Sequence, residues 1–389
     1  MNKSVIGVCG AGAMGSGIAQ VAATAGHKVI VYDSFEGTIE RSQKNIHAGL
    51  DKLVEKQKIT TEKSTDIKAN LTFTKSLADL KPAGMVIEAI VEDLGSKKKL
   101  FVELEALVSA ECILASNTSS LSIASLSSAC KKQDRVIGIH FFNPATLMPL
   151  VEIIPGITTS AHTLTFSRDL IDSWGKTTVM CKDTPGFIVN RVARSYYGES
   201  IRIYEEGWEG LPDGPVGMAT IDWAMKTFGG FKMGPFELMD FIGSDINYKV
   251  TESVWEQFFY DQRFKPSLTQ KRLYEAGWYG RKSGRGYYDY REGAQMPRPH
   301  EDEILGKAIF NRVICMLINE AFDTVYLKVA TVDDVETAMM KGVNYPKGLI
   351  AWGKELGLKH VVATLDQLYA LYGEDRYRVS VGLRKHRIE

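Results

Sequence analysis

Short and almost entirely apolar runs recur along the first half of the chain, separated by polar stretches that suit helices or turns. Strands that are apolar throughout are typical of a parallel sheet that is covered by helices on both faces. The pattern therefore predicts an α/β domain with a buried sheet. Strands are expected at 4–9, 28–33, 85–90, 113–117, 135–140, 150–154 and 176–182.

A glycine-rich turn, GAGAMG, joins the first predicted strand to a segment with a helical pattern. Gly10 permits a tight turn, Gly12 lets the backbone approach a pyrophosphate, and Gly15 lets the helix pack on the strand. The second strand ends at Asp33, whose carboxylate would bind ribose hydroxyls and repel a 2′-phosphate. These features predict a Rossmann-type site that prefers NAD to NADP.

Polar residues stand at or just beyond the ends of three predicted strands, at Glu92, Asn117 and His140. Ligands of such sheets bind beyond the carboxyl ends of the strands. Histidine suits proton transfer near neutral pH, and Glu152 lies on the next apolar run after a turn that contains two prolines. His140 is thus a candidate base that Glu152 would orient, and a purely structural histidine is the alternative.

The chain beyond Thr184 is predicted to be helical, beginning with a helix from Pro185 toward Glu206. It also contains a repeat: GFIVNRVARSYYGESIRI is echoed by AIFNRVICMLINEAFDTV, ATIDWAM by TVDDVETAM, and GPFELMDFIG by GLIAWGKELG. The matched pairs of residues include Asn190 with Asn311, Arg191 with Arg312, and Glu199 with Glu320. Asn311 is expected to be structural, because the second copy has no Rossmann domain of its own.

The predicted architecture is an α/β Rossmann-type N-terminal domain followed by two all-α C-terminal domains that look duplicated. The NAD-binding domain is expected at 1–184, the first helical domain at 185–290 and the second at 301–389. A linker rich in proline and charge, 291–300, would join the two helical copies.

Composition narrows the classes of function. The 47 basic and 47 acidic residues give a net charge of zero, so nucleic acid and anionic membranes are not expected partners. The five cysteines are scattered and lack CxxC spacing, so neither a disulfide framework nor a metal site is predicted. No apolar run approaches the length of a membrane span, and a strand begins within a few residues of the N-terminus. We expect a cytoplasmic protein.

Several motifs together resemble the L-specific 3-hydroxyacyl-CoA dehydrogenase family, which includes bacterial 3-hydroxybutyryl-CoA dehydrogenases. They are SNTSSL at 116–121, HFFNP at 140–144, LVE at 150–152 and KDTPGFIVNR at 182–191, in the family's order and spacing. The resemblance extends to Tyr290. It implies NAD-dependent interconversion of (S)-3-hydroxyacyl-CoA and 3-oxoacyl-CoA, with a short acyl chain such as 3-hydroxybutyryl.

The resemblance also implies roles for individual residues. His140 and Glu152 occupy the positions of the catalytic pair, and Ser119 and Asn190 match residues that hold oxygen atoms of the substrate. Contacts with NAD are implied for Asp33, Glu92, Lys97 and Asn117, and Lys44 aligns with a lysine that the family uses toward coenzyme A. Without the resemblance, Ser119 and Asn190 would be interpreted as local caps, and Lys44 as part of a solvated helix face.

Two departures and two rival functions stay open. Pro149 stands where the family usually has lysine, and the segment 207–221 is longer than expected. The protein could instead be a dehydrogenase of a free hydroxy or sugar acid, like gulonate dehydrogenase, or a non-catalytic relative that binds NAD or acyl-CoA. Single-copy members dimerise through the helical domain, so an internal pseudo-dimer is expected here, with self-association through another surface left open.

Overall fold

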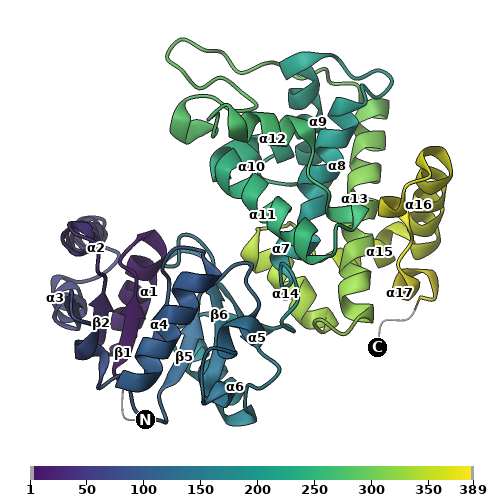
Figure 1. The fold of residues 1–389 in the computed structure, drawn as a ribbon. Helices are drawn as coiled ribbons and strands as arrows, with labels where there is room; N and C mark the ends of the chain where they lie inside the picture. Colours follow the sequence, from purple (N-terminus) through teal and green to yellow (C-terminus); the bar gives the residue numbers. More distant parts are fainter. Residues whose placement is uncertain (1–3, 387–389) are drawn as a thin grey trace. The chain divides into compact units, whose positions relative to one another are not determined.

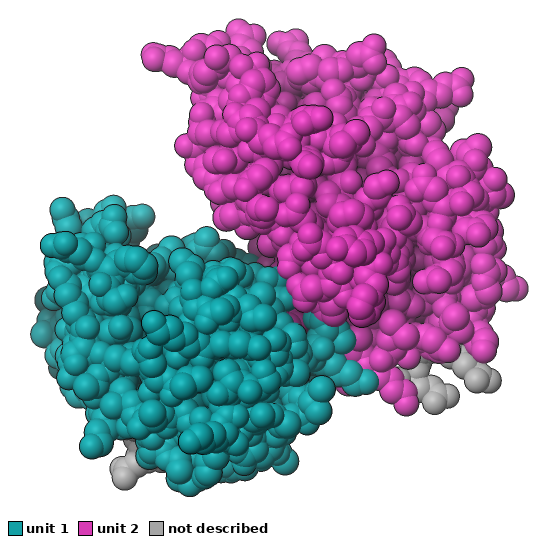
Figure 2. Space-filling model, viewed as in Figure 1, with its two compact units in different colours: residues 1–184 teal, residues 185–389 magenta. Residues whose placement is uncertain are grey.

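The computed structural model describes residues 4–386 and divides into two compact units, residues 1–184 and 185–389 (Figures 1 and 2). The boundary at Thr184 agrees with the predicted end of the first domain. The second unit is a single compact body by its contacts, so the predicted division between two helical domains within it stays a prediction.

The first unit is built on one eight-stranded sheet with the order β3-β2-β1-β4-β5-β6-β7-β8. Neighbouring strands from β3 to β6 pair in parallel, β7 is antiparallel to β6, and β8 is parallel to β7. The strands are β1 (Ile6–Cys9), β2 (Val29–Tyr32), β3 (Leu71–Thr74), β4 (Met85–Glu88), β5 (Ile113–Ser116), β6 (Val136–Phe141), β7 (Leu150–Pro155) and β8 (Thr177–Met180). This confirms the Rossmann-type prediction, although β3 was not predicted.

Helices supply the polar exterior of this unit and contribute apolar side chains to its core. In α2 the buried positions Ile39, Ser42, Ile46 and Leu50 are spaced by three or four residues, so one face packs inward and the lysine-rich face is solvated. The helices are α1 (Ala13–Thr24), α2 (Thr38–Glu55), α3 (Thr61–Ala69), η1 (Leu77–Leu80), α4 (Leu94–Leu107), α5 (Ile123–Ser127), η2 (Gln133–Arg135) and α6 (Ala161–Ser173).

The second unit is helical. Its elements are α7 (Val189–Val192), α8 (Arg194–Glu205), α9 (Gly214–Gly229), α10 (Pro235–Ile242), α11 (Ser244–Gln257), η3 (Gln262–Phe264), α12 (Leu268–Glu275), η4 (Arg281–Ser283), α13 (Glu303–Tyr326), α14 (Val332–Gly342), α15 (Leu349–Leu356), α16 (Leu358–Tyr372), η5 (Asp375–Tyr377) and α17 (Val381–Arg384). Residues 291–300 contain no helix or strand, as predicted for a linker.

The prediction that the first helix of this unit starts at Pro185 is wrong, because α7 begins only at Val189. Gly186 and Phe187 have positive φ angles of 73° and 50°, a left-handed conformation that no right-handed helix can include. Asn190 therefore lies in the first turn of a short helix, and Ala193 separates that helix from α8.

Helix α13 is the longest element of the second unit and packs against both α8 and α9 (Figure 1). Two buried ion pairs join the repeated segments crosswise. Arg191 Nε donates to Glu320 Oε1 at 2.6 Å, and Arg312 Nε donates to Glu199 Oε1 at 2.7 Å. The arginine of each segment thus binds the glutamate of the other, which is the pattern of a two-fold contact.

A second pair of matched contacts fixes the starts of α10 and α15. Asp222 accepts hydrogen bonds from two backbone N–H groups in the first turn of α10, at 2.8 and 3.0 Å, and Glu336 accepts one in α15 at 2.7 Å. A Cβ atom at Gly234 would come within 2.3 Å of Asp222, and one at Gly348 within 1.5 Å of Glu336. Glycine at both positions lets the carboxylates approach the helix starts.

Burial of Asp222 raises the pKa of its carboxyl group to about 7. The unfolded chain has a value of about 4, so between these pH values the folded protein binds more protons, and its stability falls as the pH rises. We expect Asp222→Asn to remove this dependence. The difference in free energy of unfolding between wild type and variant should change by about 2 kcal/mol from pH 5 to pH 7.

Urea unfolding at several pH values checks this, with Asp169→Asn on the surface of the first unit as a control that should keep the wild-type profile. Parallel pH profiles for the wild type and the Asp222 variant would contradict the expectation.

Candidate active site

The glycine turn has the geometry that a pyrophosphate site needs. Gly10 has a φ of 101°, and a Cβ atom at Gly15 would lie 1.8 Å from the carbonyl oxygen of Gly10. A Cβ atom at Gly12 would meet nothing within 4 Å, so this glycine faces open space, and no side chain caps the start of α1 there. The exposed turn and the uncapped helix start fit the phosphates of NAD.

Asp33 is held at the end of β2 by two backbone N–H groups. Its Oδ2 accepts a hydrogen bond from the N–H of Ala11 at 2.7 Å, and its Oδ1 accepts one from Phe35 at 2.9 Å. These bonds link the carboxylate to the glycine turn. Its place beside that turn fits the predicted contact with ribose hydroxyls.

Lys97 is buried and its ammonium group lies between two carboxylates, at 2.5 Å from Glu88 Oε1 and 3.2 Å from Glu92 Oε2. Glu88 also accepts a hydrogen bond from Ser116 Oγ at 2.7 Å. The sequence reasoning named Lys97 and Glu92 but missed Glu88. The available signal was a single acid inside an otherwise apolar strand, because a buried carboxylate requires a partner.

Glu92 fixes the loop that carries Ser119. Its Oε1 accepts hydrogen bonds from Thr118 Oγ1 at 2.6 Å and from the backbone N–H of Ser119 at 2.9 Å. Burial acts to raise the pKa of Glu92, but the Lys97 ammonium and these hydrogen bonds hold that pKa below its usual value. The carboxylate is therefore ionised, and it anchors the loop from the end of β4.

Asn117 connects the ends of two adjacent strands. Its Oδ1 accepts a hydrogen bond from the backbone N–H of Phe141 at 2.8 Å, so the end of β5 is tied to the end of β6. His140 directly precedes Phe141 on β6. Glu92, Asn117 and His140 thus lie at or just beyond the ends of β4, β5 and β6, which are neighbours in one sheet.

His140 and Glu152 face each other on the antiparallel strands β6 and β7, where they are paired in register. His140 Nδ1 lies 2.7 Å from Glu152 Oε2, and the two side chains are 7% and 0% exposed. A carboxylate on Nδ1 fixes the tautomer, which assigns proton transfer to Nε2. The predicted approach of two residues twelve positions apart is confirmed.

Lys176, and not position 149, supplies a lysine to the turn between β6 and β7. Pro149 has no charge, but Lys176 Nζ donates hydrogen bonds to the carbonyl oxygens of Ala145 at 2.5 Å and of Met148 at 2.9 Å. Burial lowers the pKa of Lys176. The sequence reasoning missed this residue because it stands far beyond the turn that it holds.

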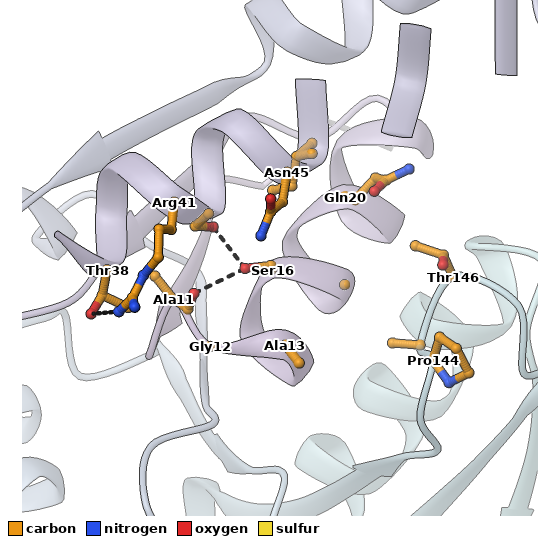
Figure 3. A pocket seen from close by; sticks show the side chains of 14 residues that line it. Ala11, Gly12, Ala13, Ser16, Gln20, Thr38, Arg41, Asn45, Pro144 and Thr146 are labelled. Atoms are coloured by element: carbon orange, nitrogen blue, oxygen red, sulfur yellow. Dashed lines mark hydrogen bonds between the residues drawn. The ribbon is translucent and has the colours of Figure 1, made fainter. Parts of the chain in front are cut away.

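A cavity of about 390 Å³ lies beside the start of α1 and is walled by α1, α2 and the turn at 144–146 (Figure 3). On its wall, Ser16 Oγ donates to the carbonyl oxygen of Ala11 at 3.0 Å and shares a hydrogen bond of 2.7 Å with Ser42 Oγ. Gln20 and Thr146 line it from two sides. The lining combines these polar side chains with apolar ones, and the cavity borders the glycine turn.

Helix α2 presents Arg41 and Asn45 to this cavity, whereas Lys44 is exposed and does not line it. The helical period explains the difference, because the lining residues 38, 41, 42, 45 and 46 together cover one face of the helix and residue 44 lies beyond the edge of that face. Sequence reasoning selected Lys44 by alignment and missed the two residues that share the cavity with Gly12.

Asn190 belongs to the second unit, where Arg194 Nη2 donates to its Oδ1 at 3.4 Å. Its repeat partner Asn311 accepts a hydrogen bond from His360 at 2.7 Å, in keeping with the structural role expected for it. Within residues 4–386, no group of three or more potential ligands could hold a metal ion, and no helix has the length and apolarity that a membrane crossing requires.

A Rossmann-type sheet with an open glycine turn, and with a buried histidine–glutamate pair at its strand ends, is the architecture of an NAD-dependent dehydrogenase. The chain belongs to the 3-hydroxyacyl-CoA dehydrogenase family. Residues 5–184 match the family's NAD-binding domain, and its C-terminal domain matches two segments, 186–290 and 309–386. The family and the cofactor predicted from the motifs are confirmed.

Individual relatives support the same assignment. The chain is 35% identical to the 3-hydroxyadipyl-CoA dehydrogenase of Escherichia coli (strain K12), over 99% of this chain and 98% of the relative. It is 40% identical to the mitochondrial hydroxyacyl-coenzyme A dehydrogenase of Sus scrofa, over 73% of this chain and 90% of the relative. A crystal structure of 3-hydroxybutyryl-CoA dehydrogenase from Escherichia coli K12 has a TM-score of 0.90 and 35% identity, and the match covers 99% of this chain and 98% of that chain.

Proposed function

We propose that this protein interconverts (S)-3-hydroxyacyl-CoA and 3-oxoacyl-CoA with NAD, and that His140 is the base. The observation that carries the proposal is the 2.7 Å contact between His140 Nδ1 and Glu152 Oε2. In the oxidation, Nε2 of His140 takes the proton of the 3-hydroxyl group, and Glu152 stabilises the imidazolium that forms. NAD, when bound, accepts the hydride from C3.

Two further residues are proposed to position the reacting oxygens. The backbone N–H of Ser119 donates a hydrogen bond to the ionised Glu92. This bond fixes the loop and so limits the positions that the Ser119 hydroxyl group can reach. Asn190 is the proposed partner of a substrate carbonyl. In the reverse reaction, protonated His140 returns its proton to the 3-oxygen.

The preferred substrate in this proposal is a short-chain thioester, as the names of the 3-hydroxybutyryl-CoA and 3-hydroxyadipyl-CoA relatives support. A purely binding function is disfavoured, because binding alone needs neither a base nor the carboxylate that orients it. A free hydroxy acid is the rival substrate, and it would leave the cavity beside α1 without a role.

The test is the loss of NADH absorbance after acetoacetyl-CoA is added to the purified protein. Free acetoacetate in place of the thioester, and NADPH in place of NADH, are the controls. We expect rapid loss only with NADH and the thioester together. If free acetoacetate were reduced as fast as acetoacetyl-CoA or faster, the proposal would be wrong and the protein would be a hydroxy-acid dehydrogenase.

We propose that the cavity beside α1 binds part of the coenzyme A moiety of the substrate. In this proposal Arg41, and not Lys44, is the cationic residue that contacts coenzyme A. Arg41→Ala is expected to raise the KM for acetoacetyl-CoA by about fivefold to tenfold at unchanged kcat, because a charged contact to a phosphate is lost in ground and transition state alike. Steady-state kinetics measure this.

Lys44→Ala is the matched control, since it removes a cation from the same helix but outside the cavity. It should leave the KM for acetoacetyl-CoA unchanged. A rise in the KM for NADH alone, after Arg41→Ala, would assign the cavity to the cofactor instead.

We also propose that the helical region is a duplication whose second copy replaces a partner subunit. The two matches to one C-terminal domain and the crosswise Arg–Glu pairs support this. Light scattering tests it, since a dimer built through the α8 and α13 faces of two chains would contradict an internal pseudo-dimer. A cytoplasmic location remains a prediction from the sequence.

A further inference from the structure

Arg194 differs from the other buried arginines of the second unit in having no carboxylate partner. It is 7% exposed, and no carboxylate of residues 4–386 lies within ion-pair distance of its guanidinium group. The others that are buried are all paired: Arg191 with Glu320 and Asp323, Arg312 with Glu199 and Glu206, and Arg376 with Glu374.

The neutral contacts of Arg194 use only part of its hydrogen-bonding capacity. Nε donates to the carbonyl oxygen of Asn190 at 2.8 Å, Nη1 to Thr251 Oγ1 at 3.1 Å, and Nη2 to Asn190 Oδ1 at 3.4 Å. A guanidinium group carries five N–H donors, so two remain for another acceptor. These contacts also place Arg194 directly against Asn190, one helical turn along the chain.

Two tyrosines complete the surroundings of this cation. The guanidinium carbon lies 4.9 Å from the ring centroid of Tyr197, and the hydroxyl group of Tyr345 is buried without a hydrogen-bond partner. Burial raises the pKa of both phenols, while the positive charge of Arg194 acts to lower it. Both remain protonated at neutral pH, so Tyr345 offers a further unused donor.

A buried cation among unused donors is an unfavourable arrangement unless an anion joins it. Taking a guanidinium group out of water without a counter-ion is unfavourable, and burial lowers the pKa of Arg194. A carboxylate can bind two N–H groups of one guanidinium group side by side, which matches the two donors that remain.

We propose that Arg194, assisted by the Tyr345 hydroxyl, binds a carboxylate at the far end of the substrate's acyl chain. The substrate class would then be coenzyme A thioesters of dicarboxylic acids. This inference rests on the proposed function, because it places the acyl chain next to Asn190. It adds a specificity-determining residue to that function, since the pairing discriminates among acyl groups and takes no part in the proton transfer.

The experiment compares 3-oxoadipyl-CoA, whose acyl chain ends in a carboxylate, with acetoacetyl-CoA, whose chain does not. We expect the wild-type enzyme to have the higher kcat/KM with 3-oxoadipyl-CoA. Arg194→Met should lower that kcat/KM by at least about tenfold more than it lowers the value for acetoacetyl-CoA. The ratio of the two values is the readout, because a loss of folded protein lowers both equally.

Two further variants keep the test decisive. Tyr345→Phe removes only a hydroxyl group and should shift the ratio in the same direction by a few fold. Arg202→Met removes another arginine from α8, one that donates to the backbone of Lys265, and should leave the ratio unchanged.

The possible results separate this inference from the function on which it rests. Turnover of acetoacetyl-CoA with no preference for 3-oxoadipyl-CoA would overturn the carboxylate site and leave the dehydrogenase proposal intact. An equal fall for both thioesters in Arg194→Met would also overturn it, because the ratio of the two kcat/KM values would then be unchanged. Failure of both substrates with the wild-type protein would remove the proposed function itself.

Discussion

Replacement of His140 by alanine is expected to lower kcat for the reduction of acetoacetyl-CoA by at least about a hundredfold, because general acid–base catalysis contributes that much or more. The effect should fall on kcat, with the KM for NADH little changed, because His140 lies outside the glycine turn that is proposed to bind the nucleotide. Steady-state assays with NADH and the thioester measure both constants.

Glu152→Gln tests the contribution of Glu152 separately from that of His140. The amide keeps the size of the side chain but cannot stabilise the imidazolium, so kcat should fall by at least about tenfold while the fold persists. His162→Ala, an exposed histidine on α6, is the control and should retain wild-type activity. Undiminished kcat in the His140 variant would remove His140 as the base.

The second large effect concerns the crosswise ion pairs of the helical unit. Glu199→Gln should lower the free energy of unfolding of this unit by about 3 kcal/mol, because it leaves the buried Arg312 with a weakened partner. Burial acts against ionisation of Glu199, but the Arg312 charge holds its pKa below the usual value, so the native pair is charged. Denaturant unfolding at pH 7, monitored by helical circular dichroism, measures the loss.

Glu320→Gln should have a similar effect, since Glu320 plays the matching part toward Arg191. Glu303→Gln is the control, because its pair with Lys307 lies on the surface of the same helix α13 and contributes less than about 1 kcal/mol. If the buried and the exposed variants lost the same small amount of stability, the crosswise pairs would not stabilise this unit.

The fold of the first unit was largely predictable because a parallel sheet requires apolar runs, and those runs are visible in the sequence. The strand β3 was missed because it lies at the sheet edge with partly exposed side chains, and its sequence LTFT has no such run. The start of α7 was misplaced because the backbone conformation of Phe187, a non-glycine residue with positive φ, has no signature in composition.

The site was predictable to the extent that its residues lie at strand ends. His140 and Glu152 follow from two apolar runs and the turn between them. Contacts that bridge distant segments were not predictable, as the hydrogen bonds from Lys176 to the turn between β6 and β7 illustrate. The helix α2 shows a third case, where alignment indicated Lys44 but the helical face selected Arg41 and Asn45 for the cavity.

In the proposed duplication, the two segments joined by the crosswise pairs can diverge from each other. Arg202 follows Arg191 by eleven residues, as Asp323 follows Arg312, yet the two positions carry opposite charges. Asp323 binds both Arg191 and Arg263, while Arg202 donates to a backbone carbonyl. In an assembly of identical subunits every substitution occurs twice, so such a difference could not arise. Because both segments share one polypeptide, each side of their contact is free to acquire its own residues, and their association is independent of protein concentration.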